Sequence, residues 1–227
     1  MNKVFHILML TGFFFALIIS CYAIYSNHFT LYSWSSIAIV PILLTYGFNI
    51  IKISHIQIYY YILMIISWGA DIMTLSGNSS IFYIGLSLYS LSYILLGSIF
   101  FKAWKNETNK NFPEIYYLFA ILLSIIVFMV TYDSSLLDII IIVQYIIHIF
   151  ILISMFYWAL KLKSIKVFKS YFLPAVIIIL LSNLLYVIDQ LVLHRLYPIV
   201  DAIVVFLYGI YLLLITKGVT FYKASTS

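Results

Sequence analysis

The chain has 227 residues, of which 65% are hydrophobic and only 8% are charged. A soluble domain has about 45–50% apolar and about 25% charged residues, so this composition excludes a soluble globular protein and indicates an integral membrane protein. The formal net charge of +5 does not indicate nucleic-acid binding, because the lysines lie in short loops between apolar stretches and form no continuous polar face.

The pattern of apolar stretches predicts transmembrane helices along the whole chain. A helix of about 20 apolar residues spans a bilayer core, and eight stretches reach that length. They are approximately 5–25, 33–53, 57–75, 80–101, 114–132, 136–159, 171–191 and 198–219. Short polar joints separate them. We therefore expect an all-α polytopic membrane bundle of eight transmembrane helices, forming a single integral membrane domain over residues 1–227.

The first stretch has a second interpretation. It could be a secretory signal peptide, with "IISC" resembling a lipobox that ends at Cys21. Seven further apolar stretches follow, and a first transmembrane helix explains this stretch equally well.

The single cysteine permits no internal disulfide. The five histidines form no HxxxH or HExxH pair, so we expect no metal site and no cofactor.

The positions of the basic residues predict the orientation of the helices. If the N-terminus faces the cytoplasm, eleven of the twelve Lys and Arg residues fall on the cytoplasmic side, and Arg195 alone falls on the other side. Positively charged loops favour the cytoplasmic side of a membrane. We therefore expect a multi-pass protein of the cell (inner) membrane with both termini in the cytoplasm.

The motif "SWGAD" (67–71) places a carboxylate inside an apolar run. Insertion of Asp at the centre of a transmembrane helix costs about 2.5–3.5 kcal/mol, and such a residue is by default a candidate functional residue. Ser67 lies one turn earlier on the same face. A structural hydrogen bond is the alternative for Asp71. Asp138, Asp189 and Asp201 lie near helix ends, where polarity is inexpensive and helix-end solvation is an alternative.

Further polar residues lie near the middle or the outer half of the expected helices. They are Gly85, Tyr89 and Tyr93 on one face, Gln144 and His148 four residues apart, Ser182 and Asn183 with Asp189 on the face of Ser182, and Asp201 with Tyr208. Each pair alone is typical of polar contacts between membrane helices. Together they predict a polar, water-accessible cavity that opens toward the outer side.

Several segments resemble the YhhN-like lysoplasmalogenase family of multi-pass membrane proteins. The resembling segments are "SWGADIMTL" (67–75), "FYIGLSLYSLSYILL" (82–96), "HIFILISMFYWA" (148–159), "LLSNLLYVIDQL" (180–191) and "YGIYLLLITKG" (208–218). They cover most of the chain in the same order. The resemblance implies hydrolysis of the vinyl-ether bond of lysoplasmalogens, which releases a fatty aldehyde, with membrane lipids or lysolipids as partners.

This chemistry needs an acid that protonates the enol-ether carbon and a group that directs water. The resemblance therefore implies catalytic roles for Asp71 and Asn183. The substrate-binding candidates are Ser67, Ser182, Tyr93, Gln144, His148, Asp189 and Tyr208.

The sequence departs from the family pattern at three positions, and these departures leave two alternatives open. Asn183 stands where the family has Asp, Tyr93 where it has His, and Leu212 where Gln is expected. A catalytically inactive relative that binds or senses lipids is the first alternative. A small transporter is the second, although Pro41 and Pro174 do not occupy the matched midplane positions that interrupted transporter helices show. The sequence contains no G-x-S-x-G motif typical of an acyl-serine hydrolase.

Overall fold

The computed structural model describes residues 3–50, 55–76, 78–108, 136–162, 165–191 and 197–222. Within these residues the chain forms seven α-helices and one π-helical turn, and no strand. In chain order they are α1 (Lys3–Tyr25), α2 (Phe29–Ile50), α3 (His55–Thr74), α4 (Ser79–Thr108), α6 (Leu136–Lys161), η1 (Phe168–Phe172), α7 (Leu173–Leu191) and α8 (Pro198–Tyr222). The expected span 114–132 lies outside the described residues.

The prediction of an all-helical fold is confirmed for the described residues. Five helical segments of the described residues are long and apolar enough to cross a bilayer: Val4–Tyr25, Phe29–Phe48, Ile84–Phe101, Phe168–Tyr186 and Pro198–Tyr222. Shorter apolar helices cover Ile58–Thr74 and His148–Lys161. The boundaries differ from the prediction at several helix ends, and α2 begins at Phe29 instead of near residue 33. Helix α4 continues to Thr108 instead of ending near residue 101, and the seventh apolar segment begins with η1 at Phe168.

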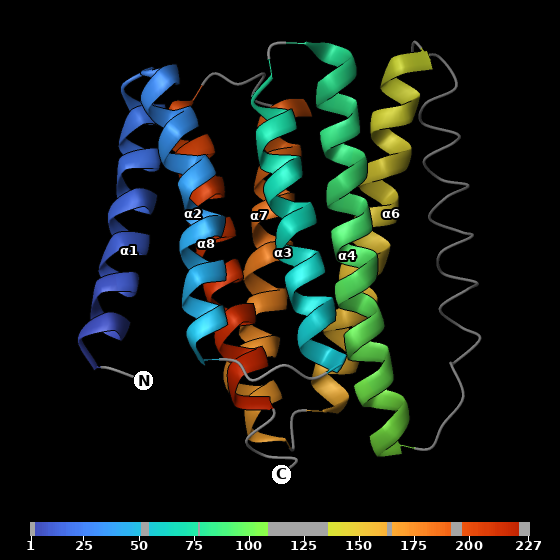
Figure 1. Cartoon of the computed structure of the whole chain (residues 1–227). Coiled ribbons are helices and arrows are strands. Elements are labelled where there is room, and N and C mark those ends of the chain that lie inside the picture. Colours follow the sequence, from blue (N-terminus) through green and yellow to red (C-terminus); the bar gives the residue numbers. More distant parts are fainter. Residues whose placement is uncertain are drawn as a thin grey trace.

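The helices stand side by side with their axes roughly parallel (Figure 1). Both ends of the chain lie at the same end of the bundle, which we call the terminal end; the α1–α2 and α3–α4 turns lie at the opposite, distal end (Figure 1). Helix α3 packs on α4, α1 on α2 and α8, α7 on α8, and α4 on α6. Helices from the first and last thirds of the chain are therefore neighbours.

Aromatic rings fill the interior of the terminal end. Phe100, Phe168, Phe172 and Tyr222 contact one another at centroid distances of 4.8–6.4 Å, mostly edge to face. In η1 the N–H of Leu173 donates to the carbonyl of Phe168, which is the wider hydrogen bond of a π-helix. Pro174, which has no N–H to donate, follows directly. This turn brings both phenylalanines into the interior, where they are almost completely buried.

Two local features determine the shape of the distal end. Helix α1 ends at Tyr25, and Asn27, two residues later, has a left-handed φ of 57°. The N–H groups of Asn27 and His28 donate to the carbonyls of Ile24 and Ala23. This pair of bonds is a Schellman motif, which turns the chain directly into α2. On the other side, Gly85 of α4 lies against α3, where an added Cβ would be 3.0 Å from the Thr74 nitrogen and 3.1 Å from the Ala70 oxygen. Only glycine allows this approach.

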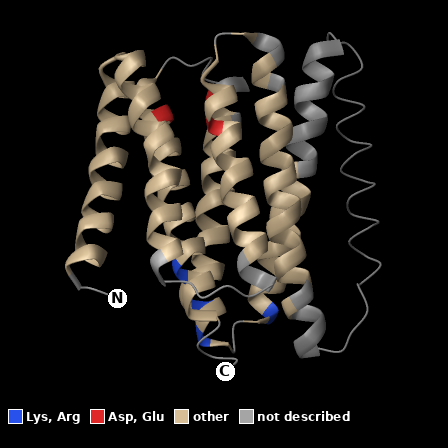
Figure 2. Ribbon diagram, in the orientation of Figure 1, with Lys and Arg blue, Asp and Glu red and all other residues tan. Residues whose placement is uncertain are grey.

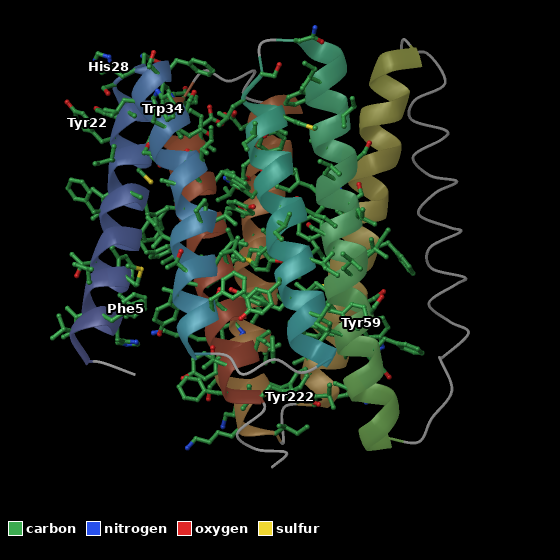
Figure 3. The ribbon with its side chains drawn as sticks, viewed as in Figure 1. Phe5, Tyr22, His28, Trp34, Tyr59 and Tyr222 are labelled. Atoms are coloured by element: carbon green, nitrogen blue, oxygen red, sulfur yellow. The ribbon has the colours of Figure 1, made fainter. Side chains whose placement is uncertain are left out.

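The two ends of the bundle carry described charges of opposite sign, and aromatic side chains lie near both ends. Described lysines lie toward the terminal end, and described acidic residues lie toward the distal end (Figure 2). Tyr22 and Trp34 lie toward the distal end, whereas Phe5, Tyr59 and Tyr222 lie toward the terminal end (Figure 3). Tyr and Trp are enriched where a membrane helix meets the headgroup region, so this distribution fits a bundle that crosses a bilayer along its long axis.

Candidate functional site

A cavity of about 580 Å³ enters the bundle from the distal end. It extends from Asn27 and Phe29 at the α1–α2 turn to Tyr93, His148 and Asn183 inside the bundle. Because a helix rises about 1.5 Å per residue, Tyr93 lies about 16 Å along α4 from Phe82, near the cavity mouth. The polar residues that line the cavity are Asn27, Tyr32, Ser36, Asp71, Thr74, Tyr89, Tyr93, His148, Ser182, Asn183, Tyr186, Asp201 and Tyr208.

Asp71 occupies the wall that α3 contributes. Its side chain is buried, and the hydroxyl of Tyr89 on α4 donates a hydrogen bond to its Oδ1. The close approach of the two helices at Gly85 makes this contact possible, because Gly85 lies one turn before Tyr89. The Thr74 hydroxyl donates to the carbonyls of Ala70 and Asp71 at 2.9 and 3.1 Å. The hydrogen bonds of Thr74 and Tyr89 therefore fix the position of the Asp71 backbone and side chain.

The inner end of the cavity is a chain of polar contacts between α4, α6 and α7. Asn183 Nδ2 donates to the carbonyl of Ile179 at 2.9 Å and more weakly to the Tyr93 hydroxyl at 3.4 Å. The rings of Tyr93 and His148 meet edge to face at 5.1 Å. His148 Nε2 lies 2.7 Å from the Ser90 hydroxyl. These bonds use the amide hydrogens of Asn183, and its Oδ1 remains an acceptor that suits a water molecule or a hydroxyl.

Helix α8 completes the wall and is held to α7. Ser182 donates its hydroxyl hydrogen to the carbonyl of Val204 at 3.1 Å. The ring of Tyr208 meets that of Tyr89 edge to face, with the centroids 6.0 Å apart. Asp201 lies in the first turn of α8 and also lines the cavity. Two carboxylates from different helices, Asp71 and Asp201, therefore share this one space.

The structure brings six of the nine sequence-predicted site residues together. Asp71, Tyr93, His148, Ser182, Asn183 and Tyr208 all line the cavity. Ser67 and Asp189 are buried but do not line it. The side chain of Gln144 lies outside the described residues. The second carboxylate of the cavity is thus Asp201 of α8 and not Asp189, because Asp189 lies on the part of α7 that does not form the cavity wall.

Several lining residues were absent from the predicted set although a signal for some of them existed. Tyr32 and Ser36 lie on α2, where no site residue was predicted. Tyr89, which the sequence analysis placed on the face of Tyr93, precedes it by one turn, and Tyr186 follows Ser182 by one turn. Residues four apart share a helix face, so the predicted residues could have been extended to these partners. Ser90 differs, because it reaches the site only through its contact with His148 on another helix.

Among the described residues, no group of three His, Cys, Asp or Glu side chains converges in the way that a metal site requires. The cavity instead combines two carboxylates, one imidazole, two amides, several hydroxyls and aromatic rings. This set can transfer protons, orient water and contact an amphipathic molecule. No family model, curated protein or solved structure matches the chain. The resemblance to the YhhN-like lysoplasmalogenase family therefore stays a prediction.

Proposed function

We propose that the protein crosses the cell (inner) membrane eight times, with both termini in the cytoplasm and the cavity open toward the outer side. The common position of the two chain ends supports an even number of crossings (Figure 1). The lysines at the terminal end support a cytoplasmic location for that end (Figure 2). With this orientation the cavity lies beneath the outer leaflet, where a lipid can reach it.

Within that membrane we propose that the protein hydrolyses the vinyl-ether bond of a lysoplasmalogen-type lipid. The observation that carries this proposal is the cavity, in which Asp71 lies in the same space as Asn183, Asp201 and several tyrosine hydroxyls. Such a cavity provides an acid and a water-orienting group away from bulk water. The apolar lining, which includes Ile39, Leu86 and Ile179, can hold a hydrocarbon chain.

The reaction needs one proton donor and one water molecule. The Asp71 carboxylic acid donates its proton to the outer vinyl carbon, and the adjacent carbon becomes an oxocarbenium ion. Water held by the Asn183 Oδ1 attacks that carbon and gives a proton back to the Asp71 carboxylate, forming a hemiacetal. The hemiacetal then separates into a fatty aldehyde and the glycerophospho-base, whose glycerol hydroxyl is the leaving alcohol. Tyr89 fixes Oδ1 of Asp71, which leaves Oδ2 to carry the proton.

The test is aldehyde release from a vinyl-ether lysolipid by the purified protein in an uncharged detergent. We expect Asp71→Asn to abolish it, because the amide cannot donate the proton. Asp189→Asn is the matched control, since it makes the same change at a buried Asp that does not line the cavity. Equal aldehyde release by wild type and Asp71→Asn contradicts the assignment.

A second candidate function is lipid binding or sensing without turnover. The observation that favours it is the amide at position 183, where the family resemblance implies a second carboxylate; here it is bonded to Ile179 and Tyr93. In that case the wild type binds lysolipid but releases no aldehyde, and Asn183→Asp creates activity. Activity already present in the wild type excludes this alternative.

A further inference from the structure

Helix α2 contains a proline in its interior, and this proline frees one backbone carbonyl. Pro41 has no N–H, so the carbonyl of Ile37, four residues earlier, lacks its usual partner within the helix. In a membrane span a neighbouring helix has to satisfy such a carbonyl, because lipid tails cannot. Here the indole N–H of Trp68 on α3 donates to the Ile37 carbonyl at 3.0 Å. A hydrogen bond between two helices therefore replaces one within α2.

The Trp68–Ile37 hydrogen bond crosses the interface between α2 and α3, beside the cavity. Asp71, which lines the cavity, follows Trp68 on α3, about 4.5 Å along the helix axis. Ile65 and Ile72 lie one turn before and one turn after Trp68, so they share its side of the helix, and both are exposed. Trp68, itself half-buried, therefore lies between the cavity and the lipid-facing surface of the bundle.

The α2–α3 interface is held more firmly toward the terminal end than toward the distal end. Near the terminal end Phe48 of α2 stacks on Tyr61 of α3, with the ring centroids 4.4 Å apart. Toward the distal end residues of both helices line the cavity, and the Ser35 hydroxyl of α2 is bonded at 2.9 Å to Ser20 of α1. Pro41 lies between these regions, and helices bend at prolines. The distal part of the interface can therefore open while the terminal part stays closed.

A lateral opening would solve a problem that the position of the cavity mouth creates. The mouth lies at the distal end, so a lipid that entered through it would first expose its hydrocarbon chain to water. Each exposed methylene group costs free energy. An opening between α2 and α3 instead lets the chain pass from the bilayer directly to apolar lining residues such as Ile39.

We infer that the α2–α3 interface distal of Pro41 is the lateral entry for the hydrocarbon chain of a membrane lipid, and that the hydrogen bond between Trp68 and the Ile37 carbonyl holds this entry closed. α2 packs more closely on α1 than on α3, so the opening forms on the α3 side. The inference rests on the proposed function for the lipid as ligand. It does not require hydrolysis.

The test compares two routes to one reporter thiol. The full-length protein carries Cys21→Ser and Ile179→Cys, which places a single cysteine in the cavity wall, and is reconstituted in phosphatidylcholine nanodiscs. N-hexadecylmaleimide reaches the thiol from the bilayer, whereas a small cationic methanethiosulfonate reaches it from water through the mouth. Labelling by the small reagent alone, with no reaction of the alkyl maleimide in any variant, excludes a lateral entry.

Trp68→Phe removes the N–H and keeps an aromatic ring. We expect the alkyl maleimide to react about fivefold faster, as the loss of one hydrogen bond provides, and the small reagent to react at an unchanged rate. Trp34→Phe is the matched control at a Trp that is 73% exposed, and it should change neither rate. An unchanged alkyl rate in Trp68→Phe overturns the inference, and an equal rise for both reagents shows general loosening and also contradicts it.

Pro41→Ala tests the acceptor of the hydrogen bond. The alanine supplies a backbone N–H to the Ile37 carbonyl, which then keeps a partner when the indole is removed. In this background Trp68→Phe should raise the alkyl rate by less than about twofold. An effect as large as in the presence of Pro41 contradicts the role of the freed carbonyl.

The aldehyde assay is separate from these measurements. A protein whose alkyl labelling responds to Trp68→Phe but that releases no aldehyde supports the lateral entry and contradicts the proposed hydrolysis. Aldehyde release together with alkyl labelling that Trp68→Phe does not change overturns the lateral entry and leaves the proposed hydrolysis intact.

Discussion

The terminal and distal ends of the bundle are built from the same helices but differ in what fills them. At the terminal end, Phe100, Phe168, Phe172 and Tyr222 pack ring against ring. At the distal end the helices enclose a cavity lined by hydroxyls and carboxylates. Because lipid tails are as apolar as the helices, packing contacts rather than hydrophobicity hold membrane helices together. The terminal end therefore stabilises the bundle, and the distal end is free to carry function.

The largest expected effect of a single substitution is at the terminal end. Phe172→Ala removes a ring that is 2% exposed and packs on Phe100 and Phe168. We expect a loss of about 3 kcal/mol in the free energy of unfolding, because the vacated space cannot close. Unfolding in mixed detergent micelles measures it. Ile177→Ala, at a position that is 40% exposed on α7, is the control and should be nearly neutral. A comparable loss at both positions contradicts the difference between the ends.

The next largest effect is expected at Gly85, where α4 lies closest to Thr74 and Ala70 of α3. Gly85→Ala places a methyl group 2.8 Å from the Thr74 side chain and 3.0 Å from its backbone nitrogen. We expect a destabilisation of about 1–3 kcal/mol from overpacking and weaker lysolipid binding, since Asp71 lies one turn before Thr74. Gly12→Ala has open space around the added methyl and should change neither quantity. Normal lysolipid binding by Gly85→Ala shows that the cavity tolerates helix separation.

A smaller effect tests the distal end alone. Tyr89→Phe removes the hydroxyl that donates to Asp71 and keeps the ring that packs on Tyr208. We expect about 1–2 kcal/mol lower stability and a clear fall in aldehyde release, because the carboxylate loses its fixed orientation. The exposed Tyr22 provides the control through Tyr22→Phe. Unchanged turnover in Tyr89→Phe argues that the hydroxyl has only a structural role.

The smallest expected effect is at the inner end of the cavity. Ser90→Ala removes the hydroxyl that lies 2.7 Å from His148 Nε2, and we expect a loss of about 1 kcal/mol in unfolding free energy. Ser98→Ala removes a hydroxyl of the same helix that is exposed and bonds the Ile94 carbonyl, and it should cost less. If Ser98→Ala costs as much, the bond between α4 and α6 adds no stability.

Much of the fold follows from the sequence because the length of an apolar stretch determines whether a helix can span a bilayer. The described helices lie where the stretches predict them. The residues at which individual helices begin and end are less predictable. Helix α4 continues through polar residues to Thr108, where composition alone indicates a loop, and the π-helical turn at Phe168 precedes the expected start of α7. Backbone hydrogen bonding and tertiary packing, which no hydropathy pattern contains, determine these ends.

The candidate site was predictable to a similar degree. Periodicity along each helix identified Asp71, Asn183 and Tyr208 as polar positions, and these line the cavity. Periodicity does not say which way each helix is rotated relative to its neighbours. Asp189 was therefore included in the predicted site and Asp201 was not, although Asp201 lines the cavity and Asp189 does not. The bond between Ser90 and His148 joins residues 58 positions apart, and no local pattern indicates it.

The hydrogen bond between Tyr89 and Asp71 has a consequence for how the protein is made. The two residues are only 18 positions apart, and they belong to consecutive helices joined by a short turn. During synthesis the acidic side chain enters the membrane long before α7 and α8 emerge from the ribosome. If α3 and α4 insert as a hairpin, the tyrosine shields the carboxyl group from the lipid immediately. In that case the hydrogen bond lowers the cost of placing Asp71 in the membrane before the later helices arrive.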